Sequence, residues 1–171
     1  FISYPDSVMV MKFTANQSGK QNLILSYCPN SEAKSNLRAD GKDGLVYTGV
    51  LDNNGMKFAF RIKAIHKGGT LEAENDRLIV KGADEVVFLL TADTDYKMNF
   101  NPDFKDPKTY VGNDPEQTTR IMMDQAVQKG YDELYRNHEA DHTALFNRVR
   151  LQLNPDISSP NLPTYQRLAN Y

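Results

Sequence analysis

Hydrophobic and polar residues alternate in short segments throughout residues 7–91, which is the pattern of β-strands. Turn-forming residues separate the segments. Asp52-Asn53-Asn54-Gly55 is the strongest turn signal, because Asn and Gly tolerate a positive φ. The pattern predicts strands at residues 7–15, 22–27, 37–40, 45–51, 57–66, 70–74, 77–81 and 85–91. We therefore expect residues 1–97 to form an antiparallel β-sandwich, built as a meander of hairpins.

Two of these segments make predictions about the core. Residues 85–91 are almost continuously hydrophobic, which places them at the centre of a sheet. In residues 7–15, one alternate set includes Lys12 and Thr14, whereas the other set is wholly apolar. We therefore expect the apolar set to face the core, and its members are Met9, Met11, Phe13 and Ala15.

Residues 114–148 follow a different pattern, because their hydrophobic residues recur every three or four positions. Asp114 at the N-cap, Pro115 at the first helical position and Gln117 three residues after the cap predict the start of a helix. Gly130 predicts its end. The apolar face of a second helix then comprises Tyr131, Leu134, Tyr135, His138, His142, Leu145, Phe146 and Val149. We expect a two-helix linker at 114–148, reached through an irregular crossing loop at 98–113.

The pattern changes again after Arg148. Val149, Leu151 and Leu153 alternate with polar residues, which predicts a strand that returns to the sandwich. We assign residues 149–171 to this strand and an extended tail, with a helix starting near Thr164. The expected fold is thus mainly β with α: a β-sandwich, a two-helix linker and a returning strand. Because the chain begins with Phe1 and its tail has no core, we also expect it to be part of a longer protein.

Composition excludes several classes of partner. The 171 residues carry a formal net charge of -2 with 25% charged residues, so we expect no nucleic-acid partner. No hydrophobic run approaches the roughly 18 residues that a membrane helix requires, so we expect no membrane partner. Cys28 is the single cysteine and cannot form an internal disulfide; we expect it to be a small buried residue.

The most distinctive chemical motif is His138-Glu139-Ala140-Asp141-His142, which satisfies the H-E-x-x-H pattern of zinc proteases. Two His residues four positions apart on a helix can share one metal ion. No further Glu follows Glu139 and no further His follows His142, so a third ligand of the usual kind is missing. We expect both His residues to pack on the apolar face of the helix, and we keep a zinc site at His138 and His142 as a less favoured alternative.

An acidic loop offers a second possible cation site. Its oxygen-bearing side chains suit calcium, and they are Asp93, Asp95, Asn99, Asn101, Asp103 and Asp106. An EF-hand starting at Asp93 would need Gly and Glu where the chain has Met98 and Phe104, so a solvated loop is favoured. We identify no nucleophile, phosphate loop or acid and base pair, and expect no catalytic residue, metal or cofactor in this chain.

Several short motifs, taken in order, resemble glycoside hydrolase family 95, the α-L-fucosidase family. They are Ser3-Tyr4-Pro5-Asp6, Gly68-Gly69-Thr70, Lys81-Gly82-Ala83-Asp84, Leu145-Phe146-Asn147-Arg148-Val149 and Leu162-Pro163-Thr164, followed by Arg167, Leu168 and Tyr171. In that family a helical linker joins an N-terminal β-supersandwich to an (α/α)6 barrel, and the barrel carries the catalytic carboxylates.

This resemblance implies that the chain is the later part of the supersandwich with its linker, and that its partner is the missing barrel of the parent protein. It implies that carbohydrate binds only through the parent, which would hydrolyse terminal α-L-fucosyl linkages with inversion. It also implies that His138, Leu145 and Phe146 pack on the sandwich, and an extracellular or periplasmic location. The alternative is a free-standing carbohydrate-binding sandwich, which requires an exposed row of aromatic residues although the chain has no Trp.

Overall fold

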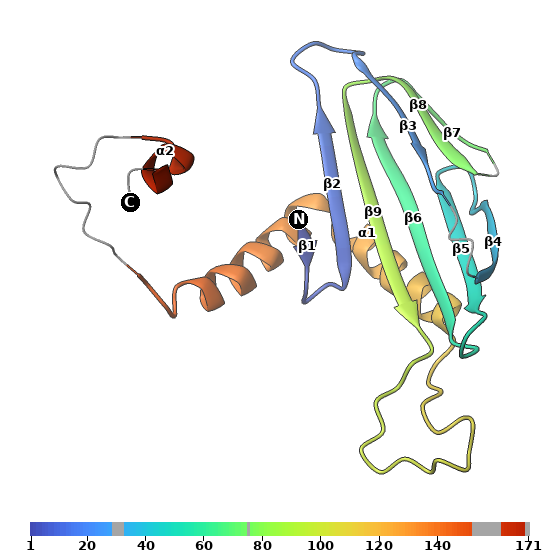
Figure 1. Ribbon diagram of the computed structural model, residues 1–171. Coiled ribbons are helices and arrows are strands. Elements are labelled where there is room, and N and C mark those ends of the chain that lie inside the picture. Colours follow the sequence, from blue (N-terminus) through green and yellow to red (C-terminus); the bar gives the residue numbers. More distant parts are fainter. Residues whose placement is uncertain (29–32, 75, 152–161, 170–171) are drawn as a thin grey trace.

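The computed structural model describes residues 1–28, 33–74, 76–151 and 162–169 (Figure 1). Two antiparallel sheets pack face to face, and a long helix crosses the outer face of the larger sheet. The predicted β-sandwich with a helical linker is therefore confirmed. No helix in the described ranges is long and apolar enough to span a membrane.

The larger sheet has six strands. In spatial order they are β1 (Ile2–Ser3), β2 (Val8–Thr14), β9 (Glu85–Thr94), β6 (Lys57–Lys67), β5 (Gly44–Leu51) and β4 (Ala33–Ala39). The hydrophobic strand β9 lies near the middle, between β2 and β6, as its composition predicts. The register pairs Met9 with Leu90 across β2 and β9, and Arg61 with Thr91 across β6 and β9.

The smaller sheet has three strands, β3 (Gln21–Ser26), β8 (Arg77–Ala83) and β7 (Thr70–Ala73). Its order repeats that of β2, β9 and β6 in the larger sheet, because each of these strands connects at one end to its counterpart. The predicted meander is therefore wrong as a description of the whole sandwich. Among the described strands, consecutive hairpins join β1 to β2, β4 to β5, β5 to β6 and β7 to β8, and at the other connections the chain changes sheets.

Three connections between the sheets, from β2 to β3, from β6 to β7 and from β8 to β9, meet at one corner. There the carboxylate of Asp84 accepts hydrogen bonds from the hydroxyl of Ser18 and the backbone N–H of Gly19, both at 2.7 Å. These bonds hold the pKa of Asp84 below its usual value. Gly69 has φ +65°, and a Cβ there would lie 2.2 Å from the carbonyl oxygen of Lys81. The corner thus requires glycine where the turn from β6 to β7 meets the backbone of β8.

The core has two parts, one on each face of the larger sheet. Between the sheets lie Leu45, Ile62, Ala64, Leu78, Val80, Ala83, Val86 and Phe88. Between the larger sheet and the helix lie Val8, Val10, Val87, Leu89, Met123, Ala126 and Leu134. The predicted orientation of β2 is wrong in part: Val8 and Val10 are buried, whereas Phe13 is 40% exposed. Because the helix covers the second face, both alternate sets of β2 contribute to a core.

Helix α1 (Pro115–Phe146) begins and bends where the sequence predicts. The carboxylate of Asp114 accepts a hydrogen bond of 3.2 Å from the N–H of Glu116, and Pro115 occupies the first turn. Gly130, with φ 74° and ψ 170°, is non-helical and divides α1 into two helical segments. The expected two-helix linker is confirmed, with a kink in place of a separate loop.

The predicted returning strand is wrong at residues 149–151. These residues form no strand, and Val149 and Leu151 are 84% and 80% exposed; Leu153 lies outside the described residues. Leu145 and Phe146 are 55% and 71% exposed, so the expectation that they pack on the sandwich is also wrong. The reason is geometric, because the last turns of α1 extend past the β1 edge of the sheet (Figure 1).

Two smaller expectations have opposite outcomes. A short helix, α2 (Thr164–Ala169), begins at the predicted Thr164. Cys28 is exposed, so the prediction of a buried cysteine is wrong. It lies two residues after the end of β3, outside the paired strand.

Candidate functional site

His138 and His142 belong to a row of aromatic rings along the second segment of α1. His138 stacks on Phe1, with ring centroids 4.9 Å apart and planes at 20°, and His142 stacks on Phe146 at 5.6 Å and 18°. The two imidazole rings are 5.8 Å apart. Within the described residues, no group of three His, Cys, Asp or Glu side chains could hold a metal ion. The geometry therefore supports ring packing of both His side chains, and His138 fixes the start of the chain to the helix.

Asp6 is a charged centre that sequence reasoning missed. Its side chain is 2% exposed and accepts hydrogen bonds from Lys129 Nζ at 2.6 Å, Asn137 Nδ2 at 3.1 Å and Ser3 Oγ at 2.5 Å. Burial raises the pKa of Asp6, but these bonds outweigh it and hold the pKa below its usual value. In the sequence, the motif Ser3-Tyr4-Pro5-Asp6 was the only indication of this site, because Lys129 and Asn137 lie 123 and 131 residues away along the chain. Asp6 therefore serves the structure, because the helix engages its oxygens.

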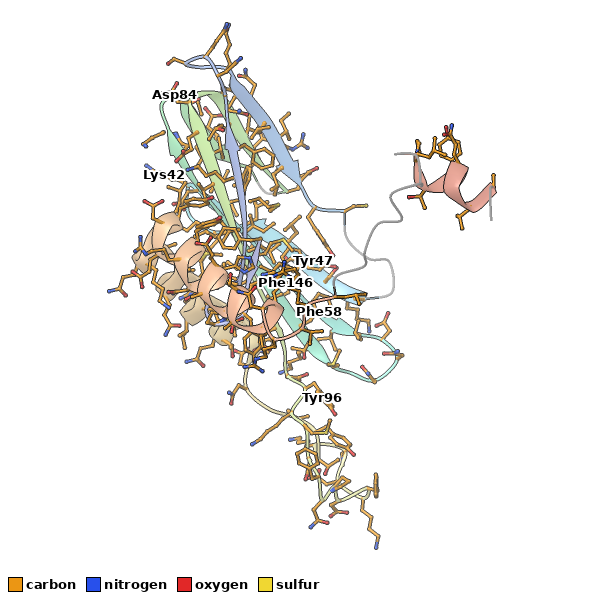
Figure 2. All side chains as sticks on the ribbon, turned by 90° about the vertical axis from the view of Figure 1, so that its left-hand side faces the viewer. Lys42, Tyr47, Phe58, Asp84, Tyr96 and Phe146 are labelled. Carbon is orange, nitrogen blue, oxygen red and sulfur yellow. The ribbon has the colours of Figure 1, made fainter. Side chains whose placement is uncertain are left out.

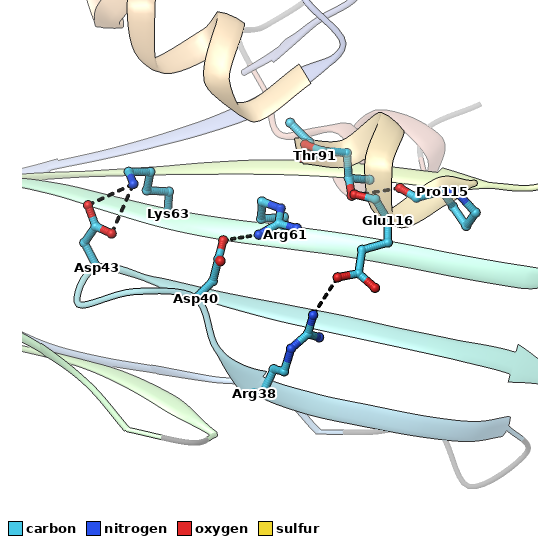
Figure 3. Close-up of polar contacts among 9 residues, drawn as sticks. Arg38, Asp40, Asp43, Arg61, Lys63, Thr91, Pro115 and Glu116 are labelled. Carbon is cyan, nitrogen blue, oxygen red and sulfur yellow. Dashed lines mark hydrogen bonds and ion pairs between the residues drawn. The ribbon is translucent and has the colours of Figure 1, made fainter. Parts of the chain in front are cut away.

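A second polar group joins the start of α1 to the larger sheet (Figure 3). Arg38 on β4 forms an ion pair of 2.5 Å with Glu116, and the hydroxyl of Thr91 on β9 donates to the carbonyl of Thr119 at 3.0 Å. Arg61 on β6 is 3% exposed and pairs with Asp40. The first two contacts fix the first segment of α1 to β4 and β9, and the third joins β6 to the turn after β4.

A groove of about 410 Å³ lies beside this polar group. It is lined by Lys34, Ser35, Asn36, Thr48, Gly49, Val50, Lys57, Phe58, Asp114, Pro115 and Glu116. Its two carboxylates are already engaged, since Asp114 caps α1 and Glu116 pairs with Arg38. The groove therefore presents polar surface without a free acid and base pair for hydrolysis among its described lining residues.

The aromatic residues on the inner sheet face form a packed cluster of Tyr27, Tyr47, Phe58 and Phe60 (Tyr47 and Phe58 are labelled in Figure 2). Neighbouring centroids are 4.5 to 5.3 Å apart and the planes are inclined at 44 to 72°. Tyr47 is only 1% exposed. The rings of this cluster are inclined to one another and packed together, so they do not form the flat, exposed row that would favour carbohydrate binding.

Residues 95–113, named here the projecting loop, extend from the end of the sandwich opposite the Asp84 corner (Figures 1 and 2). The acidic side chains that suggested calcium accept backbone hydrogen bonds instead. Asp103 accepts from the N–H of Lys105 and Asp106 from that of Lys108, both at 2.9 Å. These carboxylates therefore stabilise turns of the loop.

Comparisons with known proteins agree with this architecture. Residues 1–99 match the family model described as glycosyl hydrolase family 65, N-terminal domain. The chain is 26% identical over 181 residues to a protein named probable alpha-fucosidase A from Aspergillus niger, an alignment that covers 100% of the chain and 22% of the relative. It is 27% identical over 177 residues to alpha-L-fucosidase 2 from Arabidopsis thaliana, covering 90% of the chain and 20% of the relative.

The chain thus spans about a fifth of the length of the curated relatives it matches. The family model, in contrast, covers more than half of the chain and includes all nine described strands. All the residues that form the sandwich and its corner at Asp84 therefore lie within the matched region. On this basis the chain belongs to the glycosyl hydrolase family 65 N-terminal domain family.

Proposed function

We propose that this chain is the non-catalytic sandwich and linker of a longer glycoside hydrolase that removes terminal α-L-fucosyl groups. Two observations support the choice of fucosyl substrate: the resemblance of the sequence motifs to glycoside hydrolase family 95, and the names of the two relatives, both fucosidases. The longer protein would supply the barrel that this resemblance implies.

The proposal that this chain holds the catalytic barrel rests mainly on one observation, the apolar surface at the C-terminal end of α1. Leu145, Phe146 and Val149 are 55%, 71% and 84% exposed and follow one another where the helix leaves the sheet. Burying a large apolar side chain contributes about 1.5–3 kcal/mol, so an exposed cluster of this kind is typical of an interface. A barrel that follows the linker would cover this surface.

The proposed reaction requires two carboxyl groups on opposite sides of the glycosidic bond. In an inverting hydrolase they lie about 6.5–9.5 Å apart, so that a water molecule fits between the base and the sugar. Asp6, Asp114 and Glu116 are held by hydrogen bonds or ion pairs within the sandwich and linker. We therefore assign the acid and the base to the barrel, and the sandwich holds that barrel in place.

A direct test measures hydrolysis of a chromogenic α-L-fucoside by this chain and by the full-length protein from which it comes. We expect turnover by the full-length protein alone, with a product whose anomeric configuration, measured by NMR spectroscopy at early times, is inverted. Turnover by the isolated chain would overturn the supporting role. Absence of fucoside turnover by the full-length protein, with turnover of another glycoside, would overturn the substrate.

The interface is tested separately with Phe146→Ser, for which Glu139→Ser on the same helix is the control. Phe146 is 71% exposed in this chain and its stack on His142 lies on the surface, so its replacement should change the Tm of the isolated chain little. In the full-length protein it should lower the Tm by several degrees, because a buried contact would be lost. Equal Tm values for both full-length variants would contradict an interface at Phe146.

A further inference from the structure

We propose that the projecting loop is a second docking element, which binds the following part of the same polypeptide through Phe100 and Phe104. This inference rests on the proposed function, in that it requires a longer protein with a domain beyond the linker. It adds a contact site that lies outside the linker itself and at the opposite end of α1 from Phe146 (Figure 1).

The base of the loop is held by backbone contacts. The N–H of Lys97 donates to the carbonyl of Tyr110 at 2.7 Å, and the N–H of Gly112 donates to that of Asp95 at 2.6 Å. Tyr96 stacks on Tyr110, with ring centroids 5.8 Å apart and planes at 22°. The two arms of the loop are therefore fixed to each other where they leave the sandwich.

The outer part of the loop is ordered by polar side chains. Asn99 Nδ2 donates to the carbonyl of Thr109 at 3.1 Å, and the hydroxyl of Thr109 accepts from the N–H of Asp103 at 2.9 Å. Thr109 thus joins the second half of the loop to Asn99 and Asp103 in the first half. The loop has its own hydrogen-bonded structure, so its conformation is set before any partner binds.

The largest apolar side chains of this ordered loop point into solvent and do not pack against the rest of the loop. Phe100 is 93% exposed and Phe104 is 86% exposed, and Met98 beside them is 57% exposed. Single exposed hydrophobic residues are common, but two phenylalanines on a preordered loop combine large apolar area with a small entropic cost of binding. The loop is therefore suited to insert both rings into an apolar surface.

Charge and connectivity favour the same polypeptide as the occupant. The loop contains three Lys and three Asp residues, so it has no net charge that would attract a polyanion or a basic partner: Lys97, Lys105, Lys108, Asp95, Asp103 and Asp106. It leads directly into α1, and about four fifths of each relative's length lies outside the aligned region. A domain attached through α1 would meet the loop at a high effective concentration.

The dimensions also fit one partner at both ends of the helix. The 32 residues of α1 span at most about 48 Å, from the projecting loop to Phe146. A domain of several hundred residues has a diameter of roughly 50–60 Å. One such domain can therefore contact Phe100 and Phe104 at one end and Phe146 at the other.

Hydroxyl-radical footprinting of this chain and of the full-length protein tests the inference without any assay of activity. We expect the oxidation rates of Phe100 and Phe104 to fall several-fold in the full-length protein, because the core of an interface excludes water. Equal rates in the two proteins would overturn docking. Protection that appears in the full-length protein only when a fucosylated sugar is added would also overturn it, because the rings would then line a substrate cleft.

A pair of matched variants gives an independent readout. The double substitution Phe100→Ser and Phe104→Ser should lower the Tm of the full-length protein and leave that of the isolated chain unchanged, whereas Lys105→Ser and Lys108→Ser should change neither. Concentration-dependent protection in the isolated chain would overturn the proposal in favour of a second copy. A protein without fucoside turnover but with protected phenylalanines would refute only the proposed function.

Discussion

Lys129 Nζ lies 2.6 Å from a carboxylate oxygen of Asp6, although 123 residues separate the two along the chain. The same oxygen accepts a hydrogen bond from Asn137, which lies on the other side of the kink at Gly130. One buried carboxylate in the turn between β1 and β2 therefore holds both segments of α1. The first residues of the sandwich and the direction of the linker are coupled through this contact.

Replacing Asp6 with Ala should destabilise the chain by about 1–3 kcal/mol, because Lys129 and Asn137 lose a charged acceptor. The folded pKa of Asp6 lies below its value in the unfolded chain. Its contribution is therefore present above pH about 4 and lost as pH falls through the folded pKa. Urea unfolding at pH 7 and pH 3 measures both effects, with Asp124→Ala on the exposed side of α1 as the control. A pH-independent difference between Asp6→Ala and the wild type would contradict this explanation.

Leu134 and Leu145 lie on the same helix but differ in burial, with 0% and 55% of the side chain exposed. Leu134→Ala should reduce the free energy of unfolding by about 2–5 kcal/mol, because it leaves a cavity between α1 and β2. Leu145→Ala should change it by less than about 0.5 kcal/mol in the isolated chain. Denaturant titration of both variants checks the pair, and similar losses would show that Leu145 is covered in solution.

Two glycines separate the effect of backbone strain from that of steric contact. Gly55 has φ +72°, and a Cβ there would meet no atom within 4 Å, whereas a Cβ at Gly69 would lie 2.2 Å from a carbonyl oxygen. Gly55→Ala should cost about 1 kcal/mol through φ alone. Gly69→Ala should cost at least about 3 kcal/mol, because the corner must also separate. Thermal unfolding of both variants measures the difference in stability. Equal Tm values would show that the Cβ at residue 69 meets no close backbone contact.

Substitutions at His138 and His142 distinguish packing of the two rings from binding of a metal ion. His138→Ala should cost about 0.5–1.5 kcal/mol because it loses the stacked ring of Phe1, and His142→Ala should cost less because its side chain is more exposed. Added Zn²⁺ should not raise the Tm of the wild type. A zinc-dependent rise in Tm that either substitution abolishes would instead establish a metal site at this pair.

Local signals in the sequence predicted local structure well. Asp114 and Pro115 mark the start of α1 and Gly130 marks its kink, because capping and positive φ depend on residues that are close in sequence. The turn at Asp52-Asn53-Asn54-Gly55 likewise separates β5 from β6. These features need no knowledge of the rest of the fold.

Features set by distant contacts could not be predicted in the same way. Val8 and Val10 are buried because α1, more than a hundred residues later, covers the face opposite the small sheet. The partners of Asp6 are equally distant. Val149 and Leu151 alternate like a strand, yet the helix delivers them beyond the β1 edge of the sheet. Alternation shows which side chains share a face, but not whether that face meets a partner.

The kink at Gly130 makes the second segment of α1 a lever. From Tyr131 to Phe146 this segment is about 24 Å long, so each degree of bending at Gly130 displaces its tip by about 0.4 Å. Asp6 and Phe1 hold this segment about 11 Å from the kink, near its middle, through Asn137 and His138. A small change in these contacts would thus displace the end of α1 at Phe146, and with it the starting position of the residues that follow.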